Sequence, residues 1–166
     1  MTVKNALALH TWTLDTTPLP DVLRVTRAAG WDAVELRRLD WERADKAGQP
    51  ASAVVDQVKA SRLAVACVGV ELGWMWATGG ERVRLFKVFD EQCGRAAALG
   101  CARMMSPVDR GRGEVRAAAA SIREAGDIAG RHGVRLAVEF NSQAEQLNSL
   151  ERMREVMALV SHPAAG

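Results

Sequence analysis

The chain has 166 residues, a length typical of one domain, and we treat residues 1–166 as a single domain. Hydrophobic residues make up 48% and charged residues 25%, which excludes a disordered tail, a collagen-like fibre and a disulfide-stapled miniprotein. The formal net charge is +2, and the cations are interspersed with the acids. The sequence therefore predicts no basic stripe of the kind that binds nucleic acid.

The cysteines and the N-terminus favour a cytoplasmic location. Cys67, Cys93 and Cys101 form no CxxC pair, and their odd number suits free thiols in a reducing environment. The first residues carry too short an apolar run for a signal peptide, and no stretch of 18 apolar residues occurs. We expect a soluble cytoplasmic protein without a membrane partner.

Five short apolar runs alternate with longer amphipathic stretches. The runs are Ala6–His10, Ala33–Leu36, Leu63–Val70, Ala102–Met105 and Arg135–Glu139. Their starts lie 27 to 39 residues apart, which leaves room each time for one strand, one helix and two loops. The pattern predicts five βα units, and hence a parallel sheet with right-handed crossovers.

Apolar residues spaced three and four apart predict helices between these runs. The clearest such faces lie within Phe86–Ala96, Val115–Ala129 and Leu150–Val160, and Asn148-Ser149 offers an N-cap for the last. Prolines stand where first turns are expected, and glycines stand where helices should end: Pro20, Pro50, Gly30, Gly100 and Gly133.

Two architectures accept five βα units, a doubly wound sheet and a (βα)8 barrel. A doubly wound nucleotide binder carries a glycine-rich turn after its first strand. Here that turn reads HTWTLDTTPLP, and neither GxGxxG nor GxxxxGK[ST] occurs in the chain. We therefore predict an α/β fold of TIM-barrel type. Because a complete barrel averages about 250 residues, we expect an incomplete one with five of eight units, truncated after the fifth.

Polar side chains stand at the C-terminal ends of the predicted strands. Strand side chains alternate faces, so the aliphatic residues are expected to point outward, and His10, Glu35 and Glu139 to point inward with the alanines. Barrel enzymes place their chemistry at this end. We expect the three side chains to converge on one mouth, with Trp12 as an adjacent apolar wall. Three further polar residues follow the third and fourth runs: Glu71, Ser106 and Asp109.

Each of these residues also has a purely structural interpretation. Glu35 can pair with a neighbouring arginine, and His10 can be a satisfied core histidine. A carboxylate that closes an apolar strand, as Glu139 does, is costly to bury unless it is paired or binds a metal, and a buried ion pair is the alternative to a metal site. His132 is expected to favour a helix dipole at a C-terminus. His162 is expected to have no specific role.

Three segments carry a resemblance to a known family. The first is LALHTW, the second is AAGWDAVELR and the third is LAVEFNSQAEQLNSLERMREVMALV. In this order they resemble the first strand, the turn from a helix into the second strand, and the fifth strand with its following helix in the sugar isomerase/epimerase group of xylose isomerase-like barrels. These proteins are relatives of endonuclease IV. The resemblance covers the whole chain and implies a (βα)8 fold.

The resemblance also implies a metal and a ligand set. Family members bind one divalent cation (manganese, magnesium, cobalt or zinc) through a glutamate on strand five, an aspartate on strand six, a nearby histidine and a glutamate on strand eight. Glu139 matches the first ligand, and Glu145 stands at the place of a substrate-contacting glutamate in the ketose 3-epimerases. Asn148-Ser149 is similar to the inosose isomerase branch instead. The sequence reaches Gly166 before the strands that would carry the remaining ligands, so either it is a fragment of a longer protein or the metal site is absent. We do not expect tight metal binding by this chain alone.

The resemblance implies a sugar, sugar phosphate or polyol isomerase or epimerase. Its metal would stabilise an enediolate, and Glu139 would move the proton next to the carbonyl. His10 and Glu35 would orient substrate hydroxyls, and Trp12 would face the apolar side of the sugar. One alternative is a non-catalytic remnant or binding domain of the same fold. A second, endonuclease-like cleavage of abasic DNA, is disfavoured by the three scattered histidines and the low net charge.

The unpaired edge strands expected of an incomplete barrel favour an oligomer. In an incomplete barrel the first and fifth runs would both be sheet edges, and neither contains a proline or a lysine to block pairing. We therefore expect copies of the chain to associate through these edges. The expected ligand is a small sugar or polyol, and no nucleic acid partner is expected.

Overall fold

A computed structural model describes residues 6–108 and 110–166. The chain divides into two compact units. The first contains the described residues up to Gly69 together with Ala98–Cys101, and the second contains Val70–Ala97 and Ala102–Gly166. That residues 1–166 act as a single domain stays a prediction.

The first unit holds three parallel strands in sequence order. The strands are β1 (Ala8–His10), β2 (Ala33–Leu36) and β3 (Ala64–Gly69). The other elements are η1 (Thr11–Leu14), α1 (Leu19–Ala28), α2 (Arg38–Lys46) and α3 (Ala51–Ser61). His10 lies beside Glu35 in the register of β1 and β2. The parallel βα pattern expected from the sequence is confirmed here.

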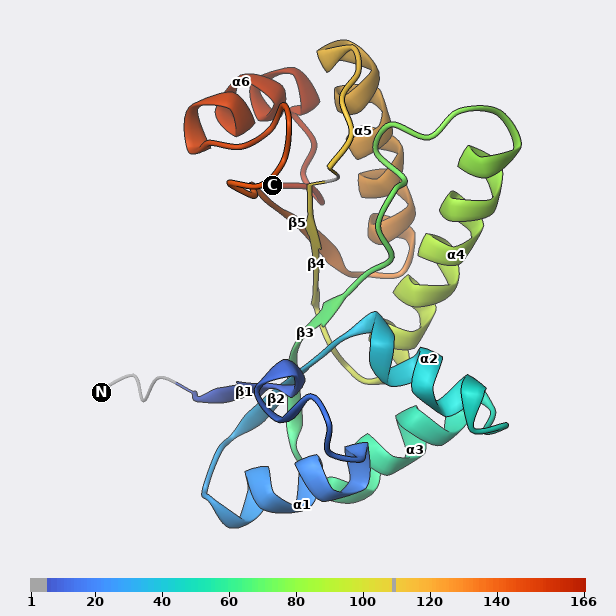
Figure 1. The fold of residues 1–166 in the computed structure, drawn as a ribbon, viewed down its shortest axis with the longest axis vertical. Helices are drawn as coiled ribbons and strands as arrows, with labels where there is room; N and C mark the ends of the chain where they lie inside the picture. Colours follow the sequence, from blue (N-terminus) through green and yellow to red (C-terminus); the bar gives the residue numbers. More distant parts are fainter. Residues whose placement is uncertain (1–5, 109) are drawn as a thin grey trace. The chain divides into compact units, whose positions relative to one another are not determined.

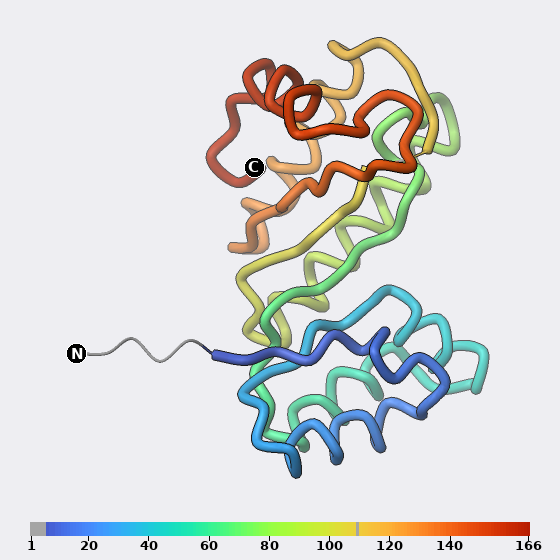
Figure 2. Tube along the Cα trace, turned by 60° about the vertical axis from the view of Figure 1, so that its left-hand side comes forward, coloured from blue at the N-terminus to red at the C-terminus, as the bar shows by residue number. Residues whose placement is uncertain are grey.

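The core of the first unit lies between its helices and strands. Val34 and Leu36 of β2 are fully buried, and so are Val54 and Val58 of α3. Helix α1 packs against α3, as the blue-to-green part of the chain shows (Figures 1 and 2). Two helices, rather than the one expected per unit, follow β2. Pro50 is the N-cap of the second, and it fits there because a proline has no amide hydrogen to donate within a helix.

The second unit holds a pair of parallel strands and three helices. The strands are β4 (Arg103–Pro107) and β5 (Arg135–Glu139), which pair at five successive positions. The helices are α4 (Gly79–Ala98), α5 (Val115–Arg131) and α6 (Leu150–Val160). Within this unit α5 packs against both β5 and α6.

The helix faces expected from apolar spacing are largely confirmed. On α5 the fully buried residues recur every three or four positions: Ala118, Ile122, Ala125 and Ala129. On α4 the expected face is buried as well: Phe86, Phe89, Cys93 and Ala96. On α6 the buried residues are Met153, Val156 and Val160, whereas Leu150 is exposed. Leu150, the first helical residue, thus lies outside the buried face of α6, Met157 is half-buried, and Val156 belongs to that face.

The strands of the second unit present two different faces. Leu136, Met104 and Ser106 are buried, whereas Arg135 and Glu139 are exposed. Such alternation is typical of a sheet that is covered on one side only. The rule that aliphatic residues pack outward fails at Leu7 of the first unit, which is 58% exposed. Leu7 precedes the first residue of β1, and its backbone forms hydrogen bonds with Asp32 and Ala33.

The last residues of the chain lie along β5. The amide of Leu136 donates to the carbonyl of Ala164 at 2.8 Å, and the amide of Val138 donates to that of Gly166 at 2.8 Å. Figure 1 shows the chain end, marked C, beside β5. The expectation that β5 presents a free edge is therefore wrong at Leu136 and Val138, because residues 164–166 already pair there.

His162 holds this terminal segment in place. Its Nε2 lies 3.1 Å from Oδ1 of Asp127, and its Nδ1 accepts a hydrogen bond from the amide of Ala164 at 3.1 Å. The imidazole packs over Gly126 of α5, where a Cβ would overlap the ring. The expectation that His162 has no specific role is thus wrong, because it connects α5 to the segment that pairs with β5.

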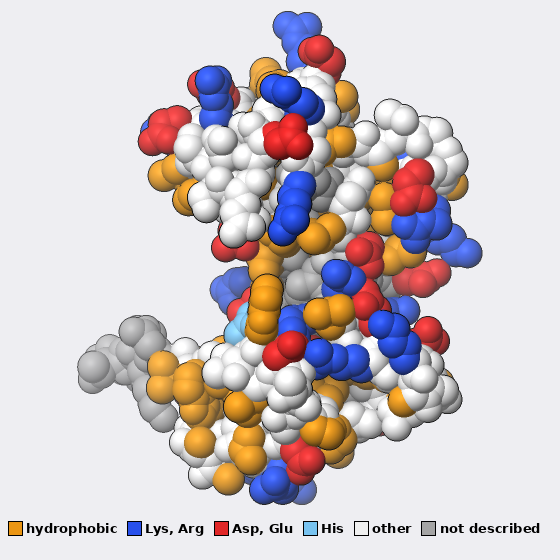
Figure 3. Space-filling view, viewed as in Figure 1, with side chains coloured by type: hydrophobic (Ala, Val, Ile, Leu, Met, Phe, Trp, Pro, Cys, Tyr) orange, Lys and Arg blue, Asp and Glu red, His pale blue; other side chains and the backbone are white. Residues whose placement is uncertain are grey.

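Charge is distributed without a continuous patch on the face shown in Figure 3. Lysine and arginine side chains alternate there with aspartates and glutamates. Charged side chains of the described residues also form local ion pairs, such as Arg84 with Glu81 and Arg152 with Glu155. Within residues 6–108 and 110–166, no helix combines the length and the apolar character needed to cross a membrane.

Candidate functional site

His10 and Glu35 form the central pair of the first unit. His10 is the last residue of β1 and lies in register with Glu35, the residue before the end of β2, and His10 Nε2 lies 3.7 Å from Glu35 Oε1. The two side chains are 33% and 27% exposed, so solvent reaches both. The amide of Trp12 donates to Nδ1 of His10 at 3.1 Å, which in the neutral imidazole places the ring proton on Nε2, facing the carboxylate. The side chain of Glu35 thus faces a histidine. The two arginines nearest to Glu35 in the sequence, Arg37 and Arg38, form ion pairs with Asp15 and Glu42 respectively.

Trp12 adds an exposed aromatic surface to this pair. Its side chain is 68% exposed, and its ring centroid lies 6.2 Å from that of His10. The guanidinium of Arg37 lies 5.8 Å from the centroid of the indole, within the range of a cation–π interaction. The tryptophan therefore stands beside the histidine as expected, with a large part of its surface available to a ligand.

A buried arginine holds the η1 turn that carries Trp12. Arg37 donates from Nε to Thr11 Oγ1 at 3.1 Å and from Nη1 to Asp15 Oδ1 at 2.6 Å. Asp40 accepts hydrogen bonds from the Thr11 hydroxyl at 2.9 Å and from the Arg37 amide at 2.8 Å. Hydrogen bonds from Arg37 and Arg43 hold the pKa of Asp15 below its usual value. These contacts join η1 to the start of α2 and so fix the position of Trp12.

Sequence reasoning missed this arginine and its partners. Arg37 lies more than twenty residues along the chain from both Thr11 and Asp15. The available signal was Arg37 itself, because it stands two residues after Glu35 on the same strand face and a charge there needs a partner. The pattern alone did not show which acid would supply it.

In the second unit, Glu139 stands at the C-terminal end of β5. It pairs in register with Pro107 of β4, and its carbonyl accepts a hydrogen bond from Val108 at 2.9 Å. The side chain is exposed rather than buried. The expectation of a costly buried carboxylate is therefore wrong, because the face of β5 that carries Glu139 is open. What the strand offers is an accessible carboxylate at its C-terminal end.

The described residues do not fit a divalent metal by themselves. No group of three His, Cys, Asp or Glu side chains is gathered for a metal within residues 6–108 and 110–166. Divalent cations of this kind need several oxygen or nitrogen ligands, and the one glutamate that matches a family ligand is Glu139.

The other strand-end candidates have different surroundings. Ser106 is fully buried and accepts a hydrogen bond from the indole nitrogen of Trp74 at 3.0 Å, so it belongs to the core. Glu71 accepts a hydrogen bond from the amide of Leu72, and its own amide donates to Gln92. Asp109 lies outside the described residues.

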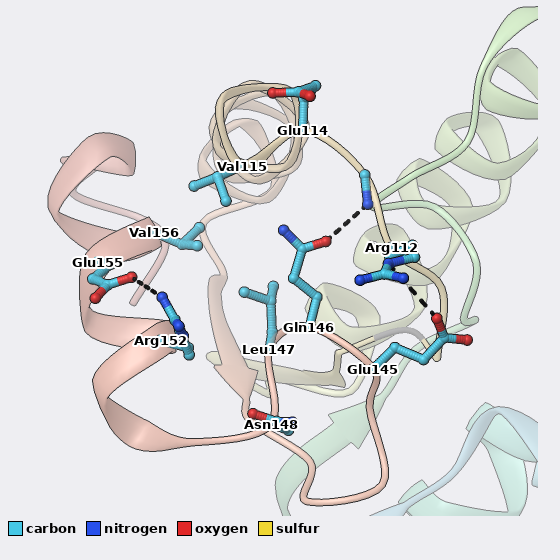
Figure 4. A pocket seen from close by; sticks show the side chains of 11 residues that line it. Arg112, Glu114, Val115, Glu145, Gln146, Leu147, Asn148, Arg152, Glu155 and Val156 are labelled. Carbon is cyan, nitrogen blue, oxygen red and sulfur yellow. Dashed lines mark hydrogen bonds and ion pairs between the residues drawn. The ribbon is translucent and has the colours of Figure 1, made fainter.

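Glu145 lies in a surface hollow of the second unit. The hollow has a volume of about 640 Å³ and lies between the starts of α5 and α6 (Figure 4). Glu145 Oε2 lies 3.9 Å from Nε of Arg112, and the amide of Gly113 donates to Gln146 Oε1 at 2.9 Å. Glu139 does not line this hollow. The two glutamates expected to touch substrate therefore lie in different surroundings within this unit.

Comparison with solved structures identifies the fold. A xylose isomerase domain protein from Alicyclobacillus acidocaldarius is 19% identical, with a TM-score of 0.78 over 97% of this chain and 61% of its own. An IolI protein with a zinc atom is 16% identical, with a TM-score of 0.83 over 98% of this chain and 61% of its own. D-psicose 3-epimerase with D-tagatose, from Clostridium cellulolyticum H10, is 12% identical, with a TM-score of 0.72 over 97% and 62%.

This likeness shows a TIM-barrel-type fold, and the chain spans about three fifths of the length of these proteins. Its described residues contain five strands alternating with helices, compared with eight in a complete barrel, which confirms the expected α/β class and the number of units. A search of curated protein sequences found no match. The sequence profile of xylose isomerase-like TIM barrels matches residues 23–166. The chain therefore belongs to the xylose isomerase-like TIM barrel family.

Proposed function

We propose that this chain forms the substrate-binding part of a sugar or polyol isomerase or epimerase. The observation that carries the proposal is the His10–Glu35 pair, in register at the ends of two parallel strands and next to the exposed ring of Trp12. The family supports it, since one structural neighbour is an epimerase with a ketose.

The geometry of the pair suits a hydroxyl group. The 3.7 Å between His10 Nε2 and Glu35 Oε1 is longer than a normal N–H···O hydrogen bond. The imidazole N–H and the carboxylate oxygen are thus both able to engage a ligand. A sugar hydroxyl donates and accepts at once, so it can donate to Glu35 while accepting from His10. The apolar C–H face of the same sugar would lie against Trp12.

Glu139 supplies an accessible carboxylate for proton transfer. A carboxylate can remove the proton from the carbon next to a carbonyl, which leaves an enolate with its negative charge on the carbonyl oxygen. A divalent metal, where it is bound, would supply positive charge next to that oxygen. The described residues contribute Glu139 toward such a metal, and the further ligands have to come from elsewhere. We therefore propose the isomerase or epimerase reaction for a protein in which all the metal ligands are present, and not for Glu139 by itself.

Binding is tested by adding D-tagatose or xylitol in steps to the folded protein and recording its NMR spectrum at each step. We expect saturable shifts at His10 and Trp12. His10→Gln should weaken binding at least about tenfold, equivalent to about 1.4 kcal/mol. His132→Gln is the matched control, because His132 bonds to Asp90 in the other unit. Equal affinities of the two variants, or no response to either ligand, would contradict the proposed binding role.

Proton transfer is tested separately by deuterium uptake. D-tagatose is incubated in heavy water with the protein and manganese, and uptake at the carbon next to the carbonyl is measured by NMR. Under conditions that give exchange, Glu139→Gln should abolish it while leaving the circular dichroism spectrum unchanged. Sugar binding without exchange, in a protein that also binds manganese, would favour the non-catalytic binding domain. Exchange within tenfold of the unmodified protein would reject Glu139 as the base.

A further inference from the structure

Residues 164–166, which we call the terminal segment, pair in parallel with β5 (Figure 1). The amide of Leu136 donates to the carbonyl of Ala164, and its carbonyl accepts from the amide of Gly166 at 2.9 Å. The amide of Val138 donates to the carbonyl of Gly166. Three backbone hydrogen bonds thus hold the terminal segment on β5. A pairing this short opens locally at low cost, so the side-chain contact next to it decides how firmly the segment is held.

The imidazole of His162 connects the terminal segment to α5. Its Nδ1 accepts a hydrogen bond from the amide of Ala164 at 3.1 Å, and its Nε2 lies 3.1 Å from Oδ1 of Asp127. An amide N–H can only donate, so Nδ1 has to be the unprotonated nitrogen, and Nε2 carries the proton that Asp127 accepts. The terminal segment is therefore bonded to the neutral form of the ring.

Packing fixes the same ring on the surface of α5. The side chain of His162 is 17% exposed, and it lies directly over Gly126, where a Cβ would overlap Nδ1. Gly126 is itself buried. The position of the imidazole is thus set by the helix backbone and by Asp127, and not by the terminal segment alone.

The charged groups around the ring come from one helix. On α5, Asp127 faces Nε2, whereas Arg123 donates to the carbonyl of Leu159 at 2.9 Å. The last turn of α6, residues 157–160, reads MALV and carries no charge. The residues of β5 that pair with the terminal segment are apolar as well. Asp127 is therefore the charge that the ring meets, and it meets Nε2 rather than Nδ1.

We propose that protonation of His162 releases the terminal segment from β5. A proton added to the neutral ring binds to Nδ1, which then donates and can no longer accept from Ala164. Two N–H groups would face each other across 3.1 Å, and a backbone donor that has lost its acceptor is unfavourable. Nε2–H donates to Asp127 in both forms, so the ring stays on α5 and the backbone moves away.

The neutral form thus holds the segment at higher pH, and acidification within the range of about pH 5–8, where histidines change charge, opens it. The N–H groups of Leu136 and Val138 are then exposed at the edge of β5, where a further strand can pair with them. The inference uses only residues of the second unit and does not depend on the proposed sugar site around His10.

Hydrogen exchange of the full chain, followed by NMR between pH 8 and pH 5, measures this release. The amides of Leu136, Val138 and Gly166 report on the terminal segment, and that of Arg135, which donates on the β4 side, reports on the rest of the strand. Protection factors compare each exchange rate with that of an unfolded chain at the same pH. We expect the first three factors to fall at least about tenfold, in step with titration of the His162 ring, and that of Arg135 to change less than about twofold.

Three variants identify the histidine. His162→Gln has no group that titrates in this range, so its protection factors should not depend on pH. His132→Gln is the matched control, because His132 also bonds to an aspartate through Nε2, and it should keep the full fall. Gly126→Ala displaces the ring without changing the histidine, and it should lower the three factors at both pH values.

Several results would overturn the proposal. One is titration of the His162 ring while the three protection factors stay constant, and another is a ring that does not titrate between pH 5 and pH 8. A fall that persists in His162→Gln, or one that disappears in His132→Gln, would assign the effect to another group. Unchanged factors in Gly126→Ala would show that the ring does not hold the segment. An equal fall at Arg135 would mean acid unfolding of the strand instead of release.

Discussion

Replacing Arg37 by methionine removes a buried guanidinium and retains the apolar part of the side chain. The side chain of Arg37 is 9% exposed and that of its neighbour Asp40 is 5% exposed. Removing one member of a buried ion pair costs about 3–5 kcal/mol. The lower limit applies here, because Asp40 keeps two other hydrogen bonds and Asp15 keeps Arg43. We expect a loss of about 3 kcal/mol, and at about 2–4 °C per kcal/mol a fall in Tm of roughly 6–12 °C.

Urea denaturation followed by circular dichroism measures this loss, and the next residue provides the control. Arg38 has a side chain that is 31% exposed and pairs with Glu42 on the surface of α2, so Arg38→Met should cost less than about 1 kcal/mol. Arg37→Lys should be intermediate, because lysine keeps the charge and loses the two-sided hydrogen bonding. If the methionine variants at positions 37 and 38 are equally stable, the buried network does not hold η1 in place, and the reasoning fails.

Three other variants or measurements test separate features. Because the pKa of Asp15 is lowered in the folded state, its charge stabilises the fold above the unfolded-state pKa, and this contribution is lost as the pH falls through the folded-state pKa. In Asp15→Asn the Tm should therefore fall less steeply below about pH 4. An unchanged dependence of Tm on pH in that range would contradict this. Burial raises the pKa of the Cys93 thiol to about 12, so labelling with Ellman's reagent at neutral pH, mapped by mass spectrometry, should modify the half-buried Cys67 first. Ser106→Ala leaves the buried indole N–H of Trp74 without its acceptor and should cost about 1–3 kcal/mol in urea denaturation, whereas a neutral effect would argue against that hydrogen bond.

Much of the backbone architecture could be predicted without coordinates. The runs Ala33–Leu36 and Arg135–Glu139 are strands with the predicted bounds, and the bounds of the other three strands differ from the predicted runs by at most two residues. Ser149 caps α6 as predicted, accepting a hydrogen bond from the amide of Arg152. These features depend on spacing along the chain, because helical and extended backbones present side chains with different periods.

The candidate site was predicted only in part, because side-chain partners depend on segments far apart in sequence. The sequence predicted that His10 and Glu35 lie at the same end of adjacent parallel strands, and it did not predict that they face each other. Their separation of 3.7 Å and the buried network around Arg37 did not follow. Sequence patterns also could not show that the face carrying Glu139 is open, since the same residue pattern suits a carboxylate covered by neighbouring elements.

His162 and Leu136 illustrate the difference between local and tertiary information. A histidine near the end of the chain has no local pattern that specifies a partner, yet it bonds to Asp127, 35 residues away, and helps to hold residues 164–166 against Leu136. The order of the strands and the presence of a helical segment after each follow from the sequence, because apolar periodicity reflects which side of each helix or strand is buried, whereas the second helix after β2 was not predicted. Which polar groups meet, and which strand face stays exposed, is decided by the tertiary structure, because burial and hydrogen-bond partners exist only when distant segments pack together.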